Sequence, residues 1–120
     1  MTTLTVADVL TQAAAVIRRN GWHRGYFFRQ PGGNSPENCA VCAMGAINVV
    51  VFGKPVASDV PQTWEQTQLG HNSYVAVEQF LNTDKGLGGW NDEAERTVDE
   101  VLAALEGAAQ AERNRAATPA

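Results

Sequence analysis

The longest apolar stretch of the chain is CAVCAMGAINVVVF, residues 39–52. It is too short to span a bilayer, which takes about 20 apolar residues in a helix, and a run of this length is usually buried in a protein core. Ser35 and Pro36 precede it and are typical of a helix start, because serine caps the first turn and proline fits its first position. We therefore predict a core helix from Pro36 to about Phe52, ended by Gly53.

Three further helices are predicted around this core segment. The first begins after Thr5, a typical N-cap residue, and ends at Gly21. The third is capped by Asn72-Ser73, and the last begins with the capping-box pattern Thr97-x-x-Glu100. A short helix over residues 63–69 is a further option in the polar stretch before the third helix. The apolar residues that share one face are Val6, Val9, Leu10, Ala13 and Ile17 in the first helix, Tyr74, Val77, Phe80 and Leu81 in the third, and Val98, Val101, Leu102, Leu105 and Ala109 in the last.

Between the first two helices, the aromatic run WHRGYFFR at residues 22–29 is predicted to be extended, because aromatic residues favour strands. Its partner is left open, and a small hairpin involving residues 49–52 or 56–60 would supply the hydrogen bonds that an isolated strand lacks. Residues 87–92, LGGWND, are predicted to form a glycine-rich turn. The fold class is therefore mainly α, a compact bundle of about four helices with one short extended or hairpin segment.

Length and composition describe one domain. A chain of 120 residues has room for a single core, which we assign to residues 1–112, and the Ala- and Arg-rich residues 113–120 are predicted to fray. A net charge of −4 argues against general nucleic-acid binding, which needs a basic surface, but leaves a local anion site open. The start of the chain lacks the basic and apolar regions of a signal peptide, so we expect a cytoplasmic protein without membrane association.

The two cysteines of the chain, Cys39 and Cys42, both lie in the apolar stretch. If both are on the second helix they share a face, and the simplest interpretation is that they are small buried side chains. A zinc site combining them with His23 and His71 is an alternative, but these histidines lack the paired spacing of a zinc finger. A redox-active disulfide is less favoured, because the alternating strands and helices of a thioredoxin-like unit are missing. We therefore expect no metal and no cofactor.

A catalytic interpretation makes Cys42 a nucleophile. Thiol attack requires the thiolate, and hence a base and a third group that orients the base. His23 and His71 are the histidine candidates for the base, and Asn91 or Asp92 would be the orienting group. Cys42 and Asp92 are thus the candidate catalytic residues if the protein is an enzyme.

The second candidate cluster consists of Trp90, Asn91, Asp92 and Arg96. In a structural interpretation, the tryptophan anchors the turn in the core and the adjacent Asn and Asp side chains cap it. In a functional interpretation, Trp90 stacks on a ligand at the mouth of a pocket, and Asp92 or Arg96 orients that ligand. We expect this cluster to lie against residues 39–45, so that the Cys42 thiol and the side chains after Gly89 line a common pocket.

A third candidate cluster is the stretch before the core helix, in which the arginines occur without acidic neighbours at Arg18, Arg19, Arg24 and Arg29. The simpler interpretation is a solvated basic face, partly balanced by the acidic last helix. The alternative is a site for an anion or a nucleotide, with Trp22 and Tyr26 as stacking surfaces and Arg24 and Arg29 as phosphate ligands. The chain contains no glycine-rich phosphate-binding pattern that would support a known nucleotide-binding fold.

Several segments together resemble the motifs of an uncharacterised domain family of small actinobacterial and actinophage proteins: Gly21-Trp22, Cys42-Ala-Met-Gly-Ala-Ile47, Trp90-Asn-Asp92 and Arg96-Thr97. The likeness spans about residues 6–109. Cys42 matches the family cysteine, whereas Cys39, His23 and His71 have no counterpart, which weakens the zinc, redox and Cys–His interpretations. The resemblance brings no activity, substrate or cofactor. It implies an actinobacterial or phage setting, and a phage accessory protein would act in the host cytoplasm on a host protein or signalling molecule.

The function that we expect is non-catalytic binding or regulation, directed at a host protein or a small anionic ligand. Two alternatives stay open: a cysteine-dependent hydrolase or transferase that uses Cys42, and a structural or assembly module. The predicted ligand-binding residues are Trp22, Arg24, Tyr26, Arg29, Cys42, Trp90, Asn91, Asp92 and Arg96.

Overall fold

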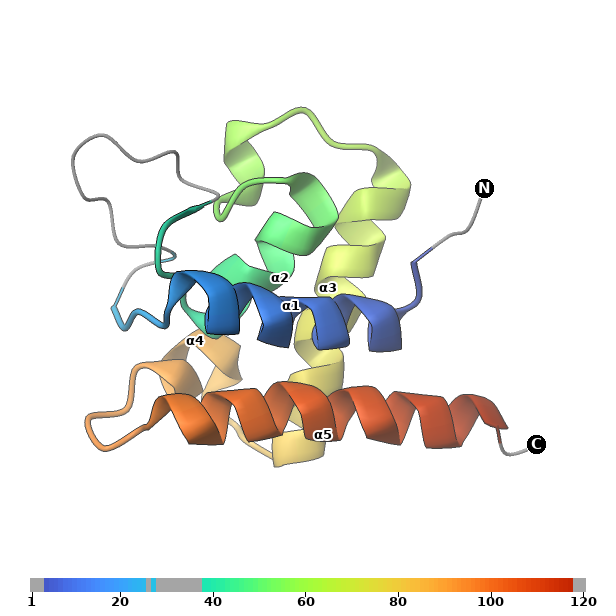
Figure 1. Cartoon of the computed structure of the whole chain (residues 1–120). Helices are drawn as coiled ribbons and strands as arrows, with labels where there is room; N and C mark the ends of the chain where they lie inside the picture. Colours follow the sequence, from blue (N-terminus) through green and yellow to red (C-terminus); the bar gives the residue numbers. More distant parts are fainter. Residues whose placement is uncertain (1–3, 26, 28–37, 118–120) are drawn as a thin grey trace.

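The computed structural model describes residues 4–25, 27 and 38–117, and in them it contains five α-helices and a short 3₁₀ helix (Figure 1). The mainly α fold class is confirmed, with five helices in place of about four and no strand in the described ranges. None of these helices combines the length and the hydropathy needed to cross a membrane. In chain order the elements are α1 (Val6–Asn20), α2 (Ala43–Phe52), η2 (Ala57–Asp59), α3 (Trp64–Leu81), α4 (Gly86–Asn91) and α5 (Val98–Ala117).

The first helix agrees with the prediction at both ends. The Thr5 hydroxyl accepts a hydrogen bond from the backbone N–H of Asp8, and the Asp8 carboxylate accepts one from the N–H of Thr5. Gly21 ends the helix with φ 98°, a backbone conformation that residues with a side chain rarely adopt. The predicted apolar face is buried, with Leu10 and Ile17 among the largest fully enclosed side chains of the core.

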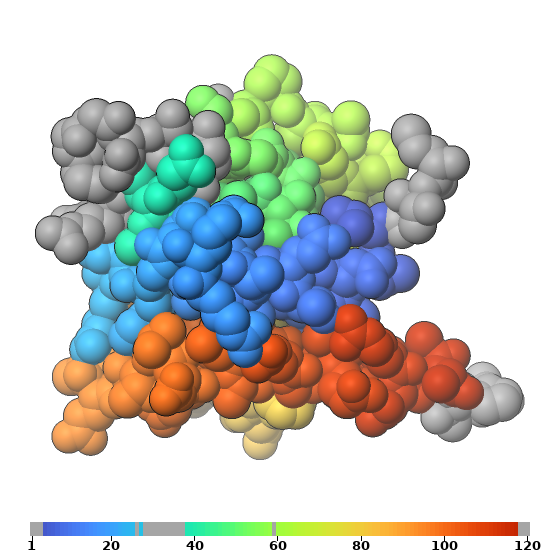
Figure 2. Space-filling model, in the orientation of Figure 1, coloured from blue at the N-terminus to red at the C-terminus, as the bar shows by residue number. Residues whose placement is uncertain are grey.

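The last helix lies alongside α1 and runs in the opposite direction (Figures 1 and 2). Its predicted capping box is confirmed, since Glu100 N–H donates to the Thr97 hydroxyl and Thr97 N–H donates to the Glu100 carboxylate. The helix continues past Glu112 to Ala117. Arg18 and Glu106 join the two helices across their exposed edge, with 2.7 Å between Nη2 and Oε2.

The prediction that the core helix begins at Pro36 is wrong in the part that can be compared. Pro36 itself lies outside the described residues, but residues 39–42 are not helical and α2 begins at Ala43, with Cys42 as its N-cap. The two cysteines therefore do not share a helical face. The predicted end is confirmed, because Gly53 stops α2 with φ 85°.

The third helix begins nine residues earlier than its predicted cap at Asn72-Ser73, and it absorbs the optional helix over residues 63–69. Its start is a second capping box, in which Thr63 and Gln66 exchange hydrogen bonds. Gly70 does not interrupt the helix; a Cβ there would lie 3.2 Å from the Phe52 ring, so the missing side chain lets α2 and α3 pack closely. Of the predicted face, Val77 is buried and Phe80 is 48% exposed.

The glycine-rich segment also differs from the prediction, because residues 86–91 form the short helix α4 and not a turn. Two apolar residues spaced by three, Leu87 and Trp90, are buried against the core, and such spacing is what a helix provides. The carboxylate of Glu78 accepts a hydrogen bond of 2.7 Å from the Leu87 N–H, which satisfies a donor in the first turn.

The extended segment after α1 finds its partner in the residues just before α2. Trp22 and Val41 form one parallel bridge: His23 N–H donates to Val41 C=O at 2.9 Å, and Val41 N–H donates to Gly21 C=O at 3.1 Å. The predicted hairpins are wrong, since residues 49–52 are helical and η2 occupies residues 57–59. In the rest of the predicted extended run, the structure describes Phe27. Tyr26, Phe28 and Arg29 lie outside the described residues.

One buried polar contact ties α2 to α3. The Asn48 side chain is 1% exposed; its Nδ2 donates to Pro55 C=O at 2.7 Å, and its Oδ1 accepts from the Tyr74 hydroxyl. Burial raises the pKa of Tyr74 to about 12. The phenol is therefore held in its protonated, hydrogen-bonding form well above neutral pH.

This raised pKa predicts a loss of stability at high pH. An exposed tyrosine ionises near pH 10, so the unfolded chain loses this proton between about pH 10 and 12 while the folded chain keeps it. The stabilisation is thus complete below about pH 10 and is lost as the pH rises toward the folded-state pKa. We expect the free energy of unfolding, measured by urea titration at a series of pH values, to fall over this range. Tyr74→Phe should show a smaller fall; an identical pH dependence in both proteins would contradict the assignment.

Candidate functional site

The start of α2 is built around the Cys42 thiol. Cys42 is 6% exposed, and its Sγ accepts a hydrogen bond of 3.2 Å from the Gly45 N–H, a donor that would otherwise lack a partner in the first helical turn. The backbone N–H of Cys42 donates to Phe27 C=O at 3.1 Å. The cysteine therefore caps α2 and holds the preceding segment against it.

Gly45 allows that segment to come close. A Cβ at this position would lie 2.1 Å from the carbonyl oxygen of Phe27, far inside van der Waals contact. Because the opposing atom belongs to the backbone, it cannot swing away as the end of a side chain would. A side chain at residue 45 is therefore incompatible with the observed position of Phe27.

The fully buried side chain of Asn91 connects three segments. Its Oδ1 accepts from Trp22 Nε1 at 2.8 Å and from the N–H of Ala43, the first residue of α2, at 3.0 Å. Its Nδ2 donates to His23 C=O at 3.3 Å and to the Asp92 carboxylate at 3.0 Å. A side-chain amide can make four hydrogen bonds of this kind, and Asn91 makes all four.

Asp92 continues the connection to the segment after α1. Its Oδ1 accepts from the Gly25 N–H at 2.9 Å as well as from Asn91. Asp92 follows the last residue of α4, so these two bonds join the end of α4 to the segment that also reaches the start of α2.

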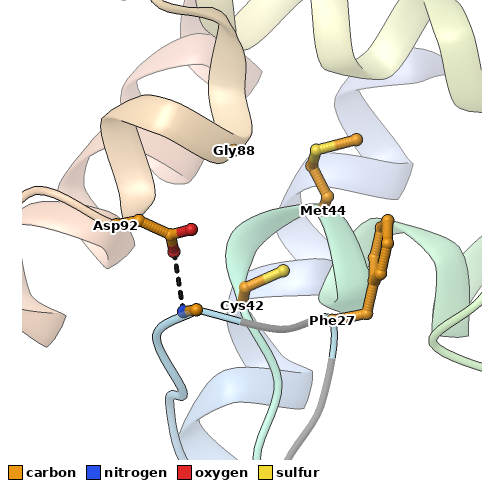
Figure 3. A pocket seen from close by; sticks show the side chains of 6 residues that line it. Phe27, Cys42, Met44, Gly88 and Asp92 are labelled. Atoms are coloured by element: carbon orange, nitrogen blue, oxygen red, sulfur yellow. Dashed lines mark hydrogen bonds between the residues drawn. The ribbon is translucent and has the colours of Figure 1, made fainter.

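A pocket of about 180 Å³ opens between these three segments (Figure 3). Figure 3 shows Asp92 on one side, Phe27 and Met44 on the other, and Cys42 between them. The predicted juxtaposition is therefore present, with the start of α2, not its middle, facing α4. The lining residues are Gly25, Phe27, Cys42, Met44, Gly88 and Asp92.

Of the predicted ligand-binding residues, Cys42 and Asp92 line this pocket. Sequence reasoning missed Phe27, Met44, Gly25 and Gly88. The signal for Met44 and Gly88 was present, since both lie inside the two segments that were expected to meet, and Phe27 is part of the aromatic run. Tyr26 and Arg29 lie outside the described residues.

The environment of Cys42 disfavours the thiolate. Burial raises the pKa of the thiol, and the negative charge of Asp92 acts in the same direction, whereas hydrogen bonds from the backbone of Gly45 and Met44 act against them. The net result is a pKa above that of an ordinary cysteine. The thiol is therefore protonated at neutral pH.

The guanidinium of Arg24 forms hydrogen bonds with the backbone of the connection between α4 and α5. It donates to the carbonyl groups of Glu93 and Ala94 at 3.1 and 2.6 Å, and to Arg96 C=O at 3.4 Å. It also lies over the Trp22 ring, 5.2 Å from the centroid. These contacts fix the connection between α4 and α5 against the segment after α1, and they leave Arg24 outside the pocket lining.

Arg96 has a similar role. Its guanidinium stacks on the Trp90 ring at 3.8 Å, and its Nε donates to Trp90 C=O at 3.0 Å. Glu93 and Glu100 pair with it at 3.2 and 3.3 Å. A framework behind the pocket is thus formed by Trp22, Arg24, Trp90, Asn91 and Arg96. The contacts of Trp90 and Asn91 are those of the structural interpretation, in which this segment anchors and caps the chain.

The zinc ligands considered from the sequence do not converge. In the described parts of the chain, which contain Cys39, Cys42, His23 and His71, no three or more His, Cys, Asp or Glu side chains form a group that could hold a metal ion. His71 lies exposed on α3.

Removing the Asn91 side chain should destabilise the whole domain. Asn91→Ala leaves the indole N–H of Trp22 and the N–H of Ala43 without an acceptor, and each buried donor that loses its partner costs about 1–3 kcal/mol. We expect the free energy of unfolding to fall by at least about 2 kcal/mol in denaturant titrations. Asn72→Ala is the matched control, since Asn72 is exposed and accepts one surface hydrogen bond, from Gln68. A similar small change in both variants would contradict the role assigned to Asn91.

Comparison with known proteins agrees with the resemblance noted in the sequence. No curated protein and no solved structure gives a significant match. A family model described as a family of unknown function matches residues 1–111, which includes all the motifs that carry the resemblance. This chain therefore belongs to the family of unknown function DUF6197.

Proposed function

We propose that this chain is a non-catalytic binding domain whose ligand occupies the pocket between Cys42 and Asp92. The observation that carries the proposal is the pocket itself, which is lined largely by Phe27, Met44 and Cys42 and has one carboxylate at its side. An apolar pocket with few polar groups is the usual form of a small-molecule site. The framework around Asn91 supports a pre-formed shape, because its four hydrogen bonds hold the surrounding segments together.

The size of the pocket favours a small occupant. A volume of about 180 Å³ is below the roughly 300–1,000 Å³ typical of sites for drug-sized ligands. The ligand in this proposal is therefore a small molecule, or one side chain of a partner protein such as a cytoplasmic host protein.

The charges around the pocket argue against the anionic ligand that the sequence suggested. Arg24 and Arg96 are engaged with backbone carbonyls and carboxylates. The N–H groups at the start of α2 also have acceptors, in the Asn91 side chain for Ala43 and in the Cys42 thiol for Gly45. An anion entering beside Asp92 would find a negative charge and few donors, so a neutral or cationic ligand is favoured.

Filling the pocket should abolish binding. A Cβ at Gly88 would make an ordinary contact of 3.4 Å with the Met44 sulfur, so the longer side chain of Gly88→Leu would occupy the pocket without a backbone clash. We expect backbone amide NMR shifts near Cys42 and Met44 when small neutral, cationic and anionic compounds are screened with the parent protein, and none with Gly88→Leu. Gly89→Leu is the control, because Gly89 is exposed and its Cβ would face Lys85.

Two results would count against the proposal. If no compound class shifts the pocket amides, the chain does not bind small ligands there, and a stable oligomer would then favour an assembly module. If Gly89→Leu abolishes binding as fully as Gly88→Leu, the ligand does not occupy this pocket.

A cysteine-dependent hydrolase or transferase is the second candidate, favoured by the position of the Cys42 sulfur in the same pocket as Asp92. Asp92 would be the helper of the thiol in such an enzyme. The raised pKa of Cys42 argues against this function, because the nucleophile in thiol catalysis is the thiolate.

Thiol reactivity separates the two candidates. We expect iodoacetamide to modify Cys42 in the folded Cys39→Ser variant more slowly at neutral pH than it modifies free cysteine, whose pKa is about 8.5. Mass spectrometry after timed quenching gives the rate, and the same variant in urea should react at the ordinary rate. Modification of folded Cys42 faster than free cysteine would overturn the non-catalytic assignment.

A further inference from the structure

Asp92 presents to the pocket one carboxylate oxygen that has no partner among the residues that the structure describes. Its Oδ1 accepts from Gly25 and Asn91, whereas Oδ2 has no hydrogen bond or ion pair within residues 4–25, 27 and 38–117. The two arginines of the framework pair elsewhere, as their contacts with carbonyls and glutamates show. Among the residues that the structure describes, no direct ion pair therefore neutralises the negative charge at the pocket.

The opposite side of the pocket is apolar and polarisable. Figure 3 shows the Phe27 ring and the Met44 thioether facing the space across from Asp92, with the Cys42 thiol between. The raised pKa of that thiol keeps it uncharged at neutral pH. An occupant that matches both sides has a positively charged end and a short apolar body.

The position of Asp92 Oδ2 favours one class of cation over others. A guanidinium binds a carboxylate best through two parallel hydrogen bonds, which need both oxygens, but Oδ1 already accepts two bonds. A quaternary ammonium has no N–H to donate and is usually held by several aromatic rings, whereas Phe27 is the one ring among the described residues that line this pocket. A primary ammonium is a compact donor that one oxygen can bind.

We propose that this pocket binds a primary ammonium group carried on a short alkyl chain, with the nitrogen at Asp92 Oδ2 and the chain between Phe27 and Met44. This inference rests on the proposed binding function and names the ligand class for that site. A free alkylamine and a lysine side chain share this chemistry. The net charge of −4 supports the approach of either one by long-range attraction.

The test compares four probes of similar size in ¹⁵N-amide NMR titrations of the full chain at neutral pH: butylamine, butanol, butyrate and butylguanidine. We expect butylamine to bind most tightly and to shift the amides of Cys42, Met44 and Gly88. A lysine-containing peptide with blocked termini, set against butylamine, tells whether the site prefers a side chain or a free amine. A preference for either one supports the inference.

The matched variants are Asp92→Asn and Asp84→Asn. Asn at residue 92 keeps an oxygen that can accept from Gly25 and Asn91 but removes the charge, and we expect butylamine affinity to fall at least about tenfold. Asp84 is exposed before α4 and does not line the pocket, so its replacement changes the net charge equally and should leave the affinity unchanged.

The outcomes separate this inference from the function on which it rests. Equal binding of butanol and butylamine, unaffected by Asp92→Asn, would retain a binding pocket and overturn the ammonium assignment. Tighter binding of butyrate or butylguanidine would overturn it as well, as would equal losses in the two Asp variants. Failure of all four probes and of the lysine peptide to shift any pocket amide would remove the binding function itself.

Discussion

The buried amide of Asn91 is the constraint on which the site depends. Four hydrogen bonds from one side chain reach the segment after α1, the first residue of α2 and the residue that follows α4. These segments are far apart in the sequence, and each supplies a wall of the pocket. Because a buried amide with an unpaired group is costly, the amide stabilises the one arrangement in which all four partners meet. The shape of the pocket therefore depends on the hydrogen bonds of Asn91, a residue that is not among those lining the pocket.

Internal hydrogen bonds also occupy two arginines of the described residues, Arg24 and Arg96. Arg24 and Arg96 each lie against a tryptophan and donate to main-chain oxygens, so their donors serve the connection between α4 and α5. Among the described residues that line the pocket, Asp92 is the charged one. Charge composition alone does not show which charged groups already have partners, so it is a weak guide to the charge of a ligand.

Sequence patterns predicted the elements whose signals are local. The Thr5 and Thr97 caps and the stops at Gly21 and Gly53 are confirmed, since side-chain caps and glycine conformations act within one turn. The start of α2 was missed because its cap is a thiol, an unusual N-cap residue. The start of α3 was placed too late because the Asn72-Ser73 pair resembles an N-cap. Packing against Phe52 decides the conformation at Gly70, and no local signal reports it. Cys42 and Asp92 were placed correctly beside each other, whereas Phe27 and Met44 line the pocket through tertiary packing that periodicity does not describe.

The backbone hydrogen bonds of Arg24 have a consequence for sequence variation. Two of its hydrogen bonds end on the main-chain oxygens of Glu93 and Ala94, which every amino acid possesses. Most substitutions at Ala94 therefore preserve these hydrogen bonds, whereas a substitution of Arg24 would remove them. The charge of the exposed connection between α4 and α5 can therefore change by substitution while these two backbone contacts stay the same.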